Sequence, residues 1–293
     1  MAQGGWPSVA MCLSGELRSF PEVHVSLLQL RKKLRNGLDV FMFVRAMAGG
    51  WNEAEAGAIT AVSPMSIRTY TDADFRAAAP SLPTPCFCAY ENKTEQNRSS
   101  SDLMSAATHF SYNGVQFWAI HRCFNMMRRH ESVRMLAAGS LEARYKWVMR
   151  ARPDVIFQEP QLRNIPQVTG RGERYEPVAH AWYRRQHVSD VFALLSRAAA
   201  DAYGEIWYEF LGGCSSLPPL EERARRCHQD IWVPEWWSIE CLIYSHLSRP
   251  SVNVSVTIHD GMRPLIVRHG KNGSRAATVV NKTAAYFVCP RRS

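Results

Sequence analysis

The sequence predicts an α/β domain with a mostly parallel β-sheet flanked by helices. Short apolar runs at 8–13 and 39–44 have the length and composition of buried strands in a parallel sheet. The segment between them, 23–38, is amphipathic and reaches the turn signal Asn36-Gly37, which indicates a helix. Strand, helix and strand within about 40 residues form the opening of a βαβ unit. A chain of 293 residues, 46% of them hydrophobic, is long enough for one large domain with a sizeable core.

Weaker patterns continue the alternation of strands and helices. Residues 45–63, rich in Gly and Ala, are expected to hold a short helix, and 65–70 a third strand or an edge strand. Residues 80–101 are proline-rich and then polar, which indicates a loop. A long helix is predicted over about 102–131, because bulky apolar side chains recur at helical spacing and form a core-facing stripe. These side chains are Phe117, Ile120, Phe124 and Met127.

The C-terminal half begins with a strand at 145–150, a turn at 151–154 and further extended structure at 155–157. An Ala-rich helix capped by Ser189 or Asp190 is predicted to run to about residue 203. The other expected elements are extended structure over 172–187, a loop over 212–219, a short basic helix over 221–227, a helix from Pro234 to 247, and a hairpin of 254–258 with 265–267 before a basic tail.

The charge of the chain favours anionic partners. The net charge is +9 and the pI about 9.3, which suits phosphates, nucleotide diphosphates, nucleic acid or acidic glycans, although a solvated arginine-rich surface explains it equally well. Nucleic acid is not expected, because the arginines are scattered and no recognition motif is present. The chain has no apolar run of about 18 residues, so no integral membrane segment is expected. Residues 1–15 lack the pattern of a signal peptide.

The cysteines and the glycosylation sequons leave the compartment open. The eight cysteines show no zinc-knuckle spacing, and buried free thiols are favoured over disulfides. Five sequons would mark surface loops if the protein were in the Golgi or ER lumen, and otherwise a cytoplasmic location is expected. The sequons begin at Asn92, Asn97, Asn253, Asn272 and Asn281.

The strongest candidate for chemistry is the segment YKWVMRARPDVIF at 145–157. An apolar strand ends there in Arg150, Arg152 and Asp154, and ligands of open α/β sheets bind at the carboxyl ends of strands. The carboxylate suits a divalent cation that bridges two phosphates, and the arginines suit phosphate oxygens. The alternative is an Arg–Asp pair that closes the turn.

A second candidate lies between the first strand and the following helix, at Ser14, Gly15 and Arg18. Gly15 permits close backbone approach, and a helix N-terminus favours an anion. Arg18 is expected near a phosphate or, equally, on the plain surface. The chain has neither GxGxxG nor GxxxxGK[ST], which argues against dinucleotide-fold dehydrogenases and P-loop ATPases.

Three segments in this order and spacing resemble glycosyltransferases of the nucleotide-sugar-binding GT-A type, found in polysaccharide-synthesis loci, algae and large algal viruses. They are SVAMCLSGELRSF, LDVFMFV and YKWVMRARPDVIF, and HVSDVFALLS and PEWWSIECLIYSHL are similar to that family's later segments. The resemblance implies a GT-A-like, Rossmann-like sheet over 1–250 that binds the donor and carries catalysis, with 251–293 as a C-terminal hairpin and basic tail on the same domain. It also implies a nucleotide-diphosphate sugar donor, a glycan or glycoprotein acceptor and often Mn²⁺ or Mg²⁺.

The resemblance assigns roles to the residues of both candidate segments. Asp154 stands where such enzymes carry the metal-binding end of an Asp-x-Asp motif, and His259 is a candidate further ligand. Arg152 replaces the first acid of that motif, and an arginine can neutralise a diphosphate without a cation, so the metal is in doubt. Ser14, Gly15, Arg18 and Arg150 are expected on the nucleotide side.

Transfer with inversion needs a base that takes the proton of the acceptor hydroxyl. Asp190 and Glu235 are the candidates, with Asp230 and Glu240 as weaker ones. Each of these acids is equally explained as a cap or first-turn residue that stabilises a helix dipole. The alternative function is a non-catalytic glycan- or nucleotide-binding protein on the same scaffold.

Overall fold

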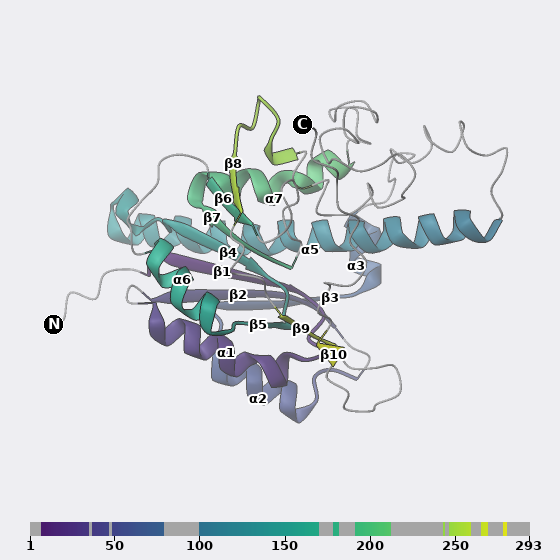
Figure 1. The fold of residues 1–293 in the computed structure, drawn as a ribbon, viewed down its shortest axis with the longest axis horizontal. Helices are drawn as coiled ribbons and strands as arrows, with labels where there is room; N and C mark the ends of the chain where they lie inside the picture. Colours follow the sequence, from purple (N-terminus) through teal and green to yellow (C-terminus); the bar gives the residue numbers. More distant parts are fainter. Residues whose placement is uncertain are drawn as a thin grey trace, which may run out of the picture.

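The fold was analysed in a computed structural model (Figure 1). It describes residues 7–34, 37–46, 49–78, 100–169, 178–181, 191–211, 243, 246–258, 265–268 and 278–279. No helix in these ranges is both long and apolar enough to cross a membrane.

A seven-stranded sheet forms the centre of the described fold, in the order β3-β2-β1-β4-β7-β6-β8. Its strands are β1 (Val9–Gly15), β2 (Leu38–Arg45), β3 (Ser66–Tyr70), β4 (Trp147–Ala151), β6 (Val178–Ala181), β7 (Phe192–Ser196) and β8 (Ser255–Ile258). The pairs β3–β2, β2–β1, β1–β4 and β6–β8 are parallel, whereas β7 runs antiparallel to both of its neighbours. The predicted α/β class with a mostly parallel sheet is therefore confirmed.

Helices cover both faces of this sheet (Figure 1). One face carries α1 (Phe20–Lys33), α2 (Glu53–Val62) and α6 (Glu159–Thr169). The long helix α5 (Ser100–Ala138) and α7 (Arg197–Leu211) lie on the other face, and α3 (Asp72–Ala78) follows β3. A single 3₁₀ turn, η2 (Leu141–Ala143), leads from α5 towards β4.

Two hydrophobic clusters, one on each face, result from the alternation of side chains along the central strands. In β1, Met11 and Leu13 join the cluster under α1, whereas Ala10 and Cys12 join the cluster under α5. Strands β1 and β2 are apolar on both faces because each is covered twice, which is why they read as continuous apolar runs in the sequence. The predicted stripe of α5, from Phe117 to Met127, is buried and packs in the second cluster.

The prediction that a helix runs through residue 192 is wrong. The helix predicted from Ser189 or Asp190 begins only at Arg197, and the run Phe192–Ser196 is instead the buried strand β7. A short apolar run buried on both faces has no periodicity that separates strand from helix, so the pattern was open to both readings. Helix α6 was missed, although Pro160 stands in its first turn, where proline is favoured.

The predicted hairpin of 254–258 with 265–267 is also wrong in its pairing. Strand β8 joins the large sheet beside β6, whereas β9 (Leu265–Arg268) lies in a separate three-stranded sheet between β5 (Val155–Ile156) and β10 (Thr278–Val279). The antiparallel C-terminal pair is β9 with β10. The expected elements at 212–219 and 221–227, and most of 234–247, lie outside the described residues.

Candidate functional site

The order of the strands places a topological switch point between β1 and β4. The chain leaves β1 for β2 on one side, and β4 pairs in parallel on the other, with Leu13 opposite Ala151. The carboxyl ends of β1, β2, β3 and β4 therefore meet at one edge of the sheet. In open α/β sheets, ligands bind at this edge beside the switch point. Both segments singled out in the sequence end there.

Gly15 ends β1 directly beside the turn that follows β4. Its φ of +131° lies in a region that residues with a Cβ rarely adopt. A Cβ placed on Gly15 would lie 3.5 Å from Cδ of Pro153, an ordinary van der Waals distance. The backbone conformation, and not the available space, is thus what requires glycine here.

Arg152 and Asp154 form a bidentate ion pair inside the turn. Arg152 Nε donates to Asp154 Oδ1 at 3.0 Å, and a terminal guanidinium nitrogen of Arg152 donates to Oδ2 at 2.7 Å. The backbone N–H of Arg152 also donates to the carbonyl of Val191 at 2.9 Å, which ties the turn to the start of β7. The Arg–Asp pair that the sequence left open as an alternative is therefore present.

This geometry does not fit a resident cation on Asp154 as the side chain stands. Asp154 is 3% exposed, and each of its two oxygens accepts a hydrogen bond from Arg152. Within the described residues, no group of three or more His, Cys, Asp and Glu side chains is arranged to hold a metal ion. The expected Mn²⁺ or Mg²⁺ site stays a prediction, since His259 lies outside the described residues.

Arg150 and Ser14 are buried on the side of the sheet that α5 covers. Arg150 is fully buried on β4, in register with Cys12 of β1 and Ala193 of β7. Ser14 is also buried, and its hydroxyl has no hydrogen-bond partner among the described residues. Their expected contact with a nucleotide stays a prediction.

The first turn of α1 offers few donors to an anion. The N–H of Phe20 donates to the carbonyl of Leu17, those of Glu22 and Val23 donate to the carbonyl of Ser19, and Pro21 has no N–H. An anion site built on free helix N–H groups was expected next to Gly15. Because these donors are already used, side chains must supply the positive charge at this edge.

Arg18 and Arg45 are the candidates for that charge, and they alternate with two carboxylates in a chain of ion pairs, Arg18–Glu16–Arg45–Asp72, at the carboxyl ends of β1, β2 and β3. Arg18 Nε donates to one carboxylate oxygen of Glu16, and Arg45 donates to the other at 2.8 Å. Arg45 also donates to Asp72 at 2.5 Å. The side chains of Arg18 and Arg45 are 56% and 37% exposed, so both guanidinium groups are open to solvent.

Electrostatics keep this chain of pairs charged. Burial raises the pKa of Glu16, but hydrogen bonds and charge from Arg18 and Arg45 outweigh it, and the pKa of Glu16 is lowered. The pKa of Arg45 is raised: burial lowers it, but the carboxylates of Glu16 and Asp72 raise it by more. Glu16, Arg45 and Asp72 were missed from the sequence. The sequence pattern that could have identified them is a charged residue at, or just after, the end of each of three successive strands.

The candidate bases Asp190 and Glu235 lie outside the described residues, as do the weaker candidates Asp230 and Glu240. Val191, which follows Asp190 in the chain, accepts a hydrogen bond from Arg152 at the carboxyl end of β4. Because β7 runs antiparallel to β4, the chain enters β7 at the same edge as the Arg152–Asp154 pair.

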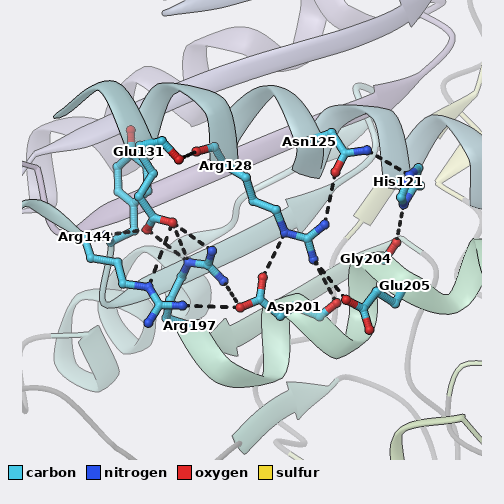
Figure 2. Close-up of polar contacts among 11 residues, drawn as sticks. His121, Asn125, Arg128, Glu131, Arg144, Arg197, Asp201, Gly204 and Glu205 are labelled. Atoms are coloured by element: carbon cyan, nitrogen blue, oxygen red, sulfur yellow. Dashed lines mark hydrogen bonds and ion pairs between the residues drawn. The ribbon is translucent and has the colours of Figure 1, made fainter. Parts of the chain in front are cut away.

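A second polar cluster lies at the opposite edge and joins α5 to α7 (Figure 2). Arg197 donates to Glu131 at 2.8 Å and pairs with Asp201 at 2.6 Å, and Arg128 pairs with Asp201 at 2.9 Å. The carboxylate of Glu131 also accepts the backbone N–H of Tyr145 at 2.9 Å. Each guanidinium faces a carboxylate, so we assign this cluster to the packing of the two helices.

Comparisons with known proteins give distant structural likeness. No protein-family model matches the chain, and no curated protein matches its sequence. One similar solved structure is a glycosyltransferase involved in the glycosylation of the major capsid of PBCV-1, with 8% identity over 87% of this chain and 83% of the other, and a TM-score of 0.34. Another is apo mouse xyloside xylosyltransferase 1, with 8% identity over 85% of this chain and 84% of the other, and a TM-score of 0.39.

Proposed function

We propose that this chain is a glycosyltransferase that moves a sugar from a nucleotide-diphosphate sugar to a glycan or glycoprotein acceptor. One observation carries the proposal: the three segments that resemble GT-A glycosyltransferases fall on β1, β2 and β4, which are adjacent parallel strands. Gly15 and the turn at 152–154, which these segments contribute, are neighbours at the switch point. The resemblance thus coincides with the place where α/β sheets bind ligands.

The reaction needs positive charge at that edge. The bond between the anomeric carbon and the donor phosphate breaks, the acceptor oxygen forms a bond to that carbon, and negative charge develops on the departing diphosphate. Guanidinium groups held in place before the reaction stabilise such charge. Arg18 and Arg45 are the partly exposed cations at the edge, and Glu16 holds both.

The acceptor hydroxyl must lose a proton, and a carboxylate suits that task. We propose Asp190 as the base, with Glu235 as the alternative. The support for Asp190 is its covalent neighbour Val191, which is hydrogen-bonded to Arg152 at the carboxyl end of β4. A divalent cation would supply further neutralisation of the diphosphate, but Asp154 does not fit one as its side chain stands, because Arg152 donates to both of its oxygens.

The test is a thermal-shift panel of UDP, GDP and CMP sugars, with and without Mn²⁺, followed by an assay for released nucleotide. A ligand at about 100 times its Kd stabilises by about 2.7 kcal/mol, which is about 5 °C in Tm for a domain of this size. We expect one nucleotide class to give such a shift and slow release of nucleotide. No shift with any compound would contradict the proposal, and a shift without turnover would identify a non-catalytic binding protein.

A further inference from the structure

We infer that Glu16 occupies the place of an anionic ligand group between Arg18 and Arg45, so that a bound diphosphate displaces its carboxylate. The site is an anion site with an internal competitor. Its ligand class is a di- or polyphosphate, and only the identification of that ligand as the sugar donor rests on the proposed function. Arg45 becomes a phosphate-binding residue beside Arg18.

The carboxylate of Glu16 bridges the two arginines. One oxygen of the Glu16 carboxylate accepts a hydrogen bond from Arg18, and the other oxygen accepts one from Arg45. A phosphate group presents oxygens to arginines in the same forked way and carries more charge. Glu16 thus fills a position between two cations in which a phosphate would fit.

The two arginines are more exposed to solvent than the carboxylate between them. Arg18 and Arg45 keep 56% and 37% of their side chains open to solvent, whereas Glu16 keeps 20%. An ion pair this exposed contributes little to stability, so a stronger anion can replace Glu16 at small cost. The pair Arg152–Asp154 nearby behaves differently, since both of its members are largely buried and their two hydrogen bonds close a turn.

Glu16 and Arg45 stand at the carboxyl ends of two neighbouring parallel strands. Glu16 directly follows Gly15, the last residue of β1, and Arg45 is the last residue of β2. Both therefore lie at the edge where open α/β sheets bind ligands, Glu16 beside the switch point and Arg45 one strand away from it. Asp72 holds Arg45 from the side of β3, which keeps that guanidinium at the edge when Glu16 leaves.

The experiment measures the Kd of inorganic pyrophosphate by calorimetry at low ionic strength, with the full chain. Glu16→Gln removes the competing charge with little change of shape. We expect pyrophosphate to bind this variant about threefold to tenfold more tightly than the wild type. Adding Arg18→Gln or Arg45→Gln to Glu16→Gln should weaken binding again by at least as much.

Glu159→Gln is the matched control, because it removes one negative charge from an exposed ion pair, with Lys33 at the end of α1, and touches neither Arg18 nor Arg45. We expect it to change the Kd by less than about twofold, because Glu16 still fills the position between the two arginines. Equal tightening in both variants would show that net charge suffices and would overturn the inference. Unchanged or weaker binding in Glu16→Gln, or no binding to any form, would also overturn it. Should Glu16→Gln fold poorly, Glu16→Ser takes its place.

Turnover of nucleotide sugars separates this inference from the proposed function. If the pyrophosphate series behaves as expected but no donor binds or reacts, the anion site stands and the donor assignment fails. If a donor is turned over but Glu16→Gln weakens pyrophosphate, glycosyl transfer stands and Glu16 is instead the residue that positions the two arginines.

Discussion

The phenol of Tyr145 donates a 2.7 Å hydrogen bond to the carboxylate of Asp39, at the start of β2. The same oxygen of Asp39 accepts a 3.1 Å hydrogen bond from Arg134 of α5, whose guanidinium also lies 4.3 Å from the centre of the Tyr145 ring. All three side chains are buried. Asp39 belongs to the glycosyltransferase-like strand pattern, yet it lies at the amino-terminal edge, away from the candidate site, and therefore acts in packing.

Asp39→Asn is expected to destabilise the fold by about 3 kcal/mol, because it leaves the buried guanidinium of Arg134 without its carboxylate. Urea denaturation checks the free energy of unfolding. Asp72→Asn, which removes a carboxylate from an exposed pair, should cost less than about 1 kcal/mol. Similar costs for the two variants would contradict the packing role of Asp39.

Asp154→Asn distinguishes a structural pair from a metal ligand. If the pair with Arg152 holds the turn, the variant should lose about 3 kcal/mol of stability, and Arg152→Gln combined with it should recover part of that loss. The measurement is again denaturation, with and without Mn²⁺. A stable Asp154→Asn protein that has lost a Mn²⁺-dependent rise in Tm would instead make Asp154 a metal ligand.

His121 should make the contact between α5 and α7 sensitive to pH. Its Nδ1 lies 2.9 Å from the carbonyl of Gly204, and its Nε2 lies 2.8 Å from the side-chain nitrogen of Asn125, which fits a neutral ring that donates at Nδ1 and accepts at Nε2. Burial lowers the pKa of His121, the carbonyl of Gly204 opposes this, and the charges of Arg128 and Arg122 lower it further.

Because the pKa of His121 is lower in the folded state, the unfolded chain binds more protons. The contribution to stability is therefore complete above about pH 6.5 and is lost as the pH falls through the lowered folded pKa. Melting temperatures from pH 8 to pH 5 should fall less steeply in His121→Asn than in the wild type. The pKa of His130 is also lowered, mainly by burial. Part of the pH dependence of the melting temperature should therefore persist in His121→Asn. An identical slope in both proteins would contradict the assignment.

Gly15→Ala should destabilise the fold by about 1–3 kcal/mol, through backbone strain and not through a clash, because φ is +131° and the nearest atom is 3.5 Å away. Gly57→Ala is the control. Gly57 lies inside α2 with nothing within 4 Å of an added Cβ, so alanine should stabilise by about 0.5–1 kcal/mol. Opposite signs of the two changes in denaturation midpoint are the expected result.

The parts of the fold that the sequence predicted well are those with a local signal. Strands β1 and β2 are apolar along their length, and α1 between them carries an amphipathic pattern, so no distant contact was needed to place them. Strand β7 was mistaken for a helix, and β8 and β9 were paired with each other. In both cases the pairing partner, which no local pattern encodes, decided the outcome.

The sequence likewise singled out only some residues of the candidate site. Gly15 and the Arg152–Asp154 turn were singled out because each sits in a compact motif next to a strand. The contact of Glu16 with Arg45 joins residues of two different strands, and it follows only from their parallel register, with Gly15 opposite Val44. The burial of Arg150 likewise depends on distant elements, the helices α5 and α7, which cover that face of the sheet.

The thiols of Cys12 and Cys123 are free and buried at the contact between β1 and α5, as the sequence predicted for these two residues. Burial, and then the neighbouring Cys123 thiol, raises the pKa of Cys12. Cys123 itself lies 3.6 Å from the carbonyl of Phe41. Alkylating reagents can reach this pair only when the long helix lifts from the sheet, so the labelling rate of the two thiols measures how often that layer opens in the native protein.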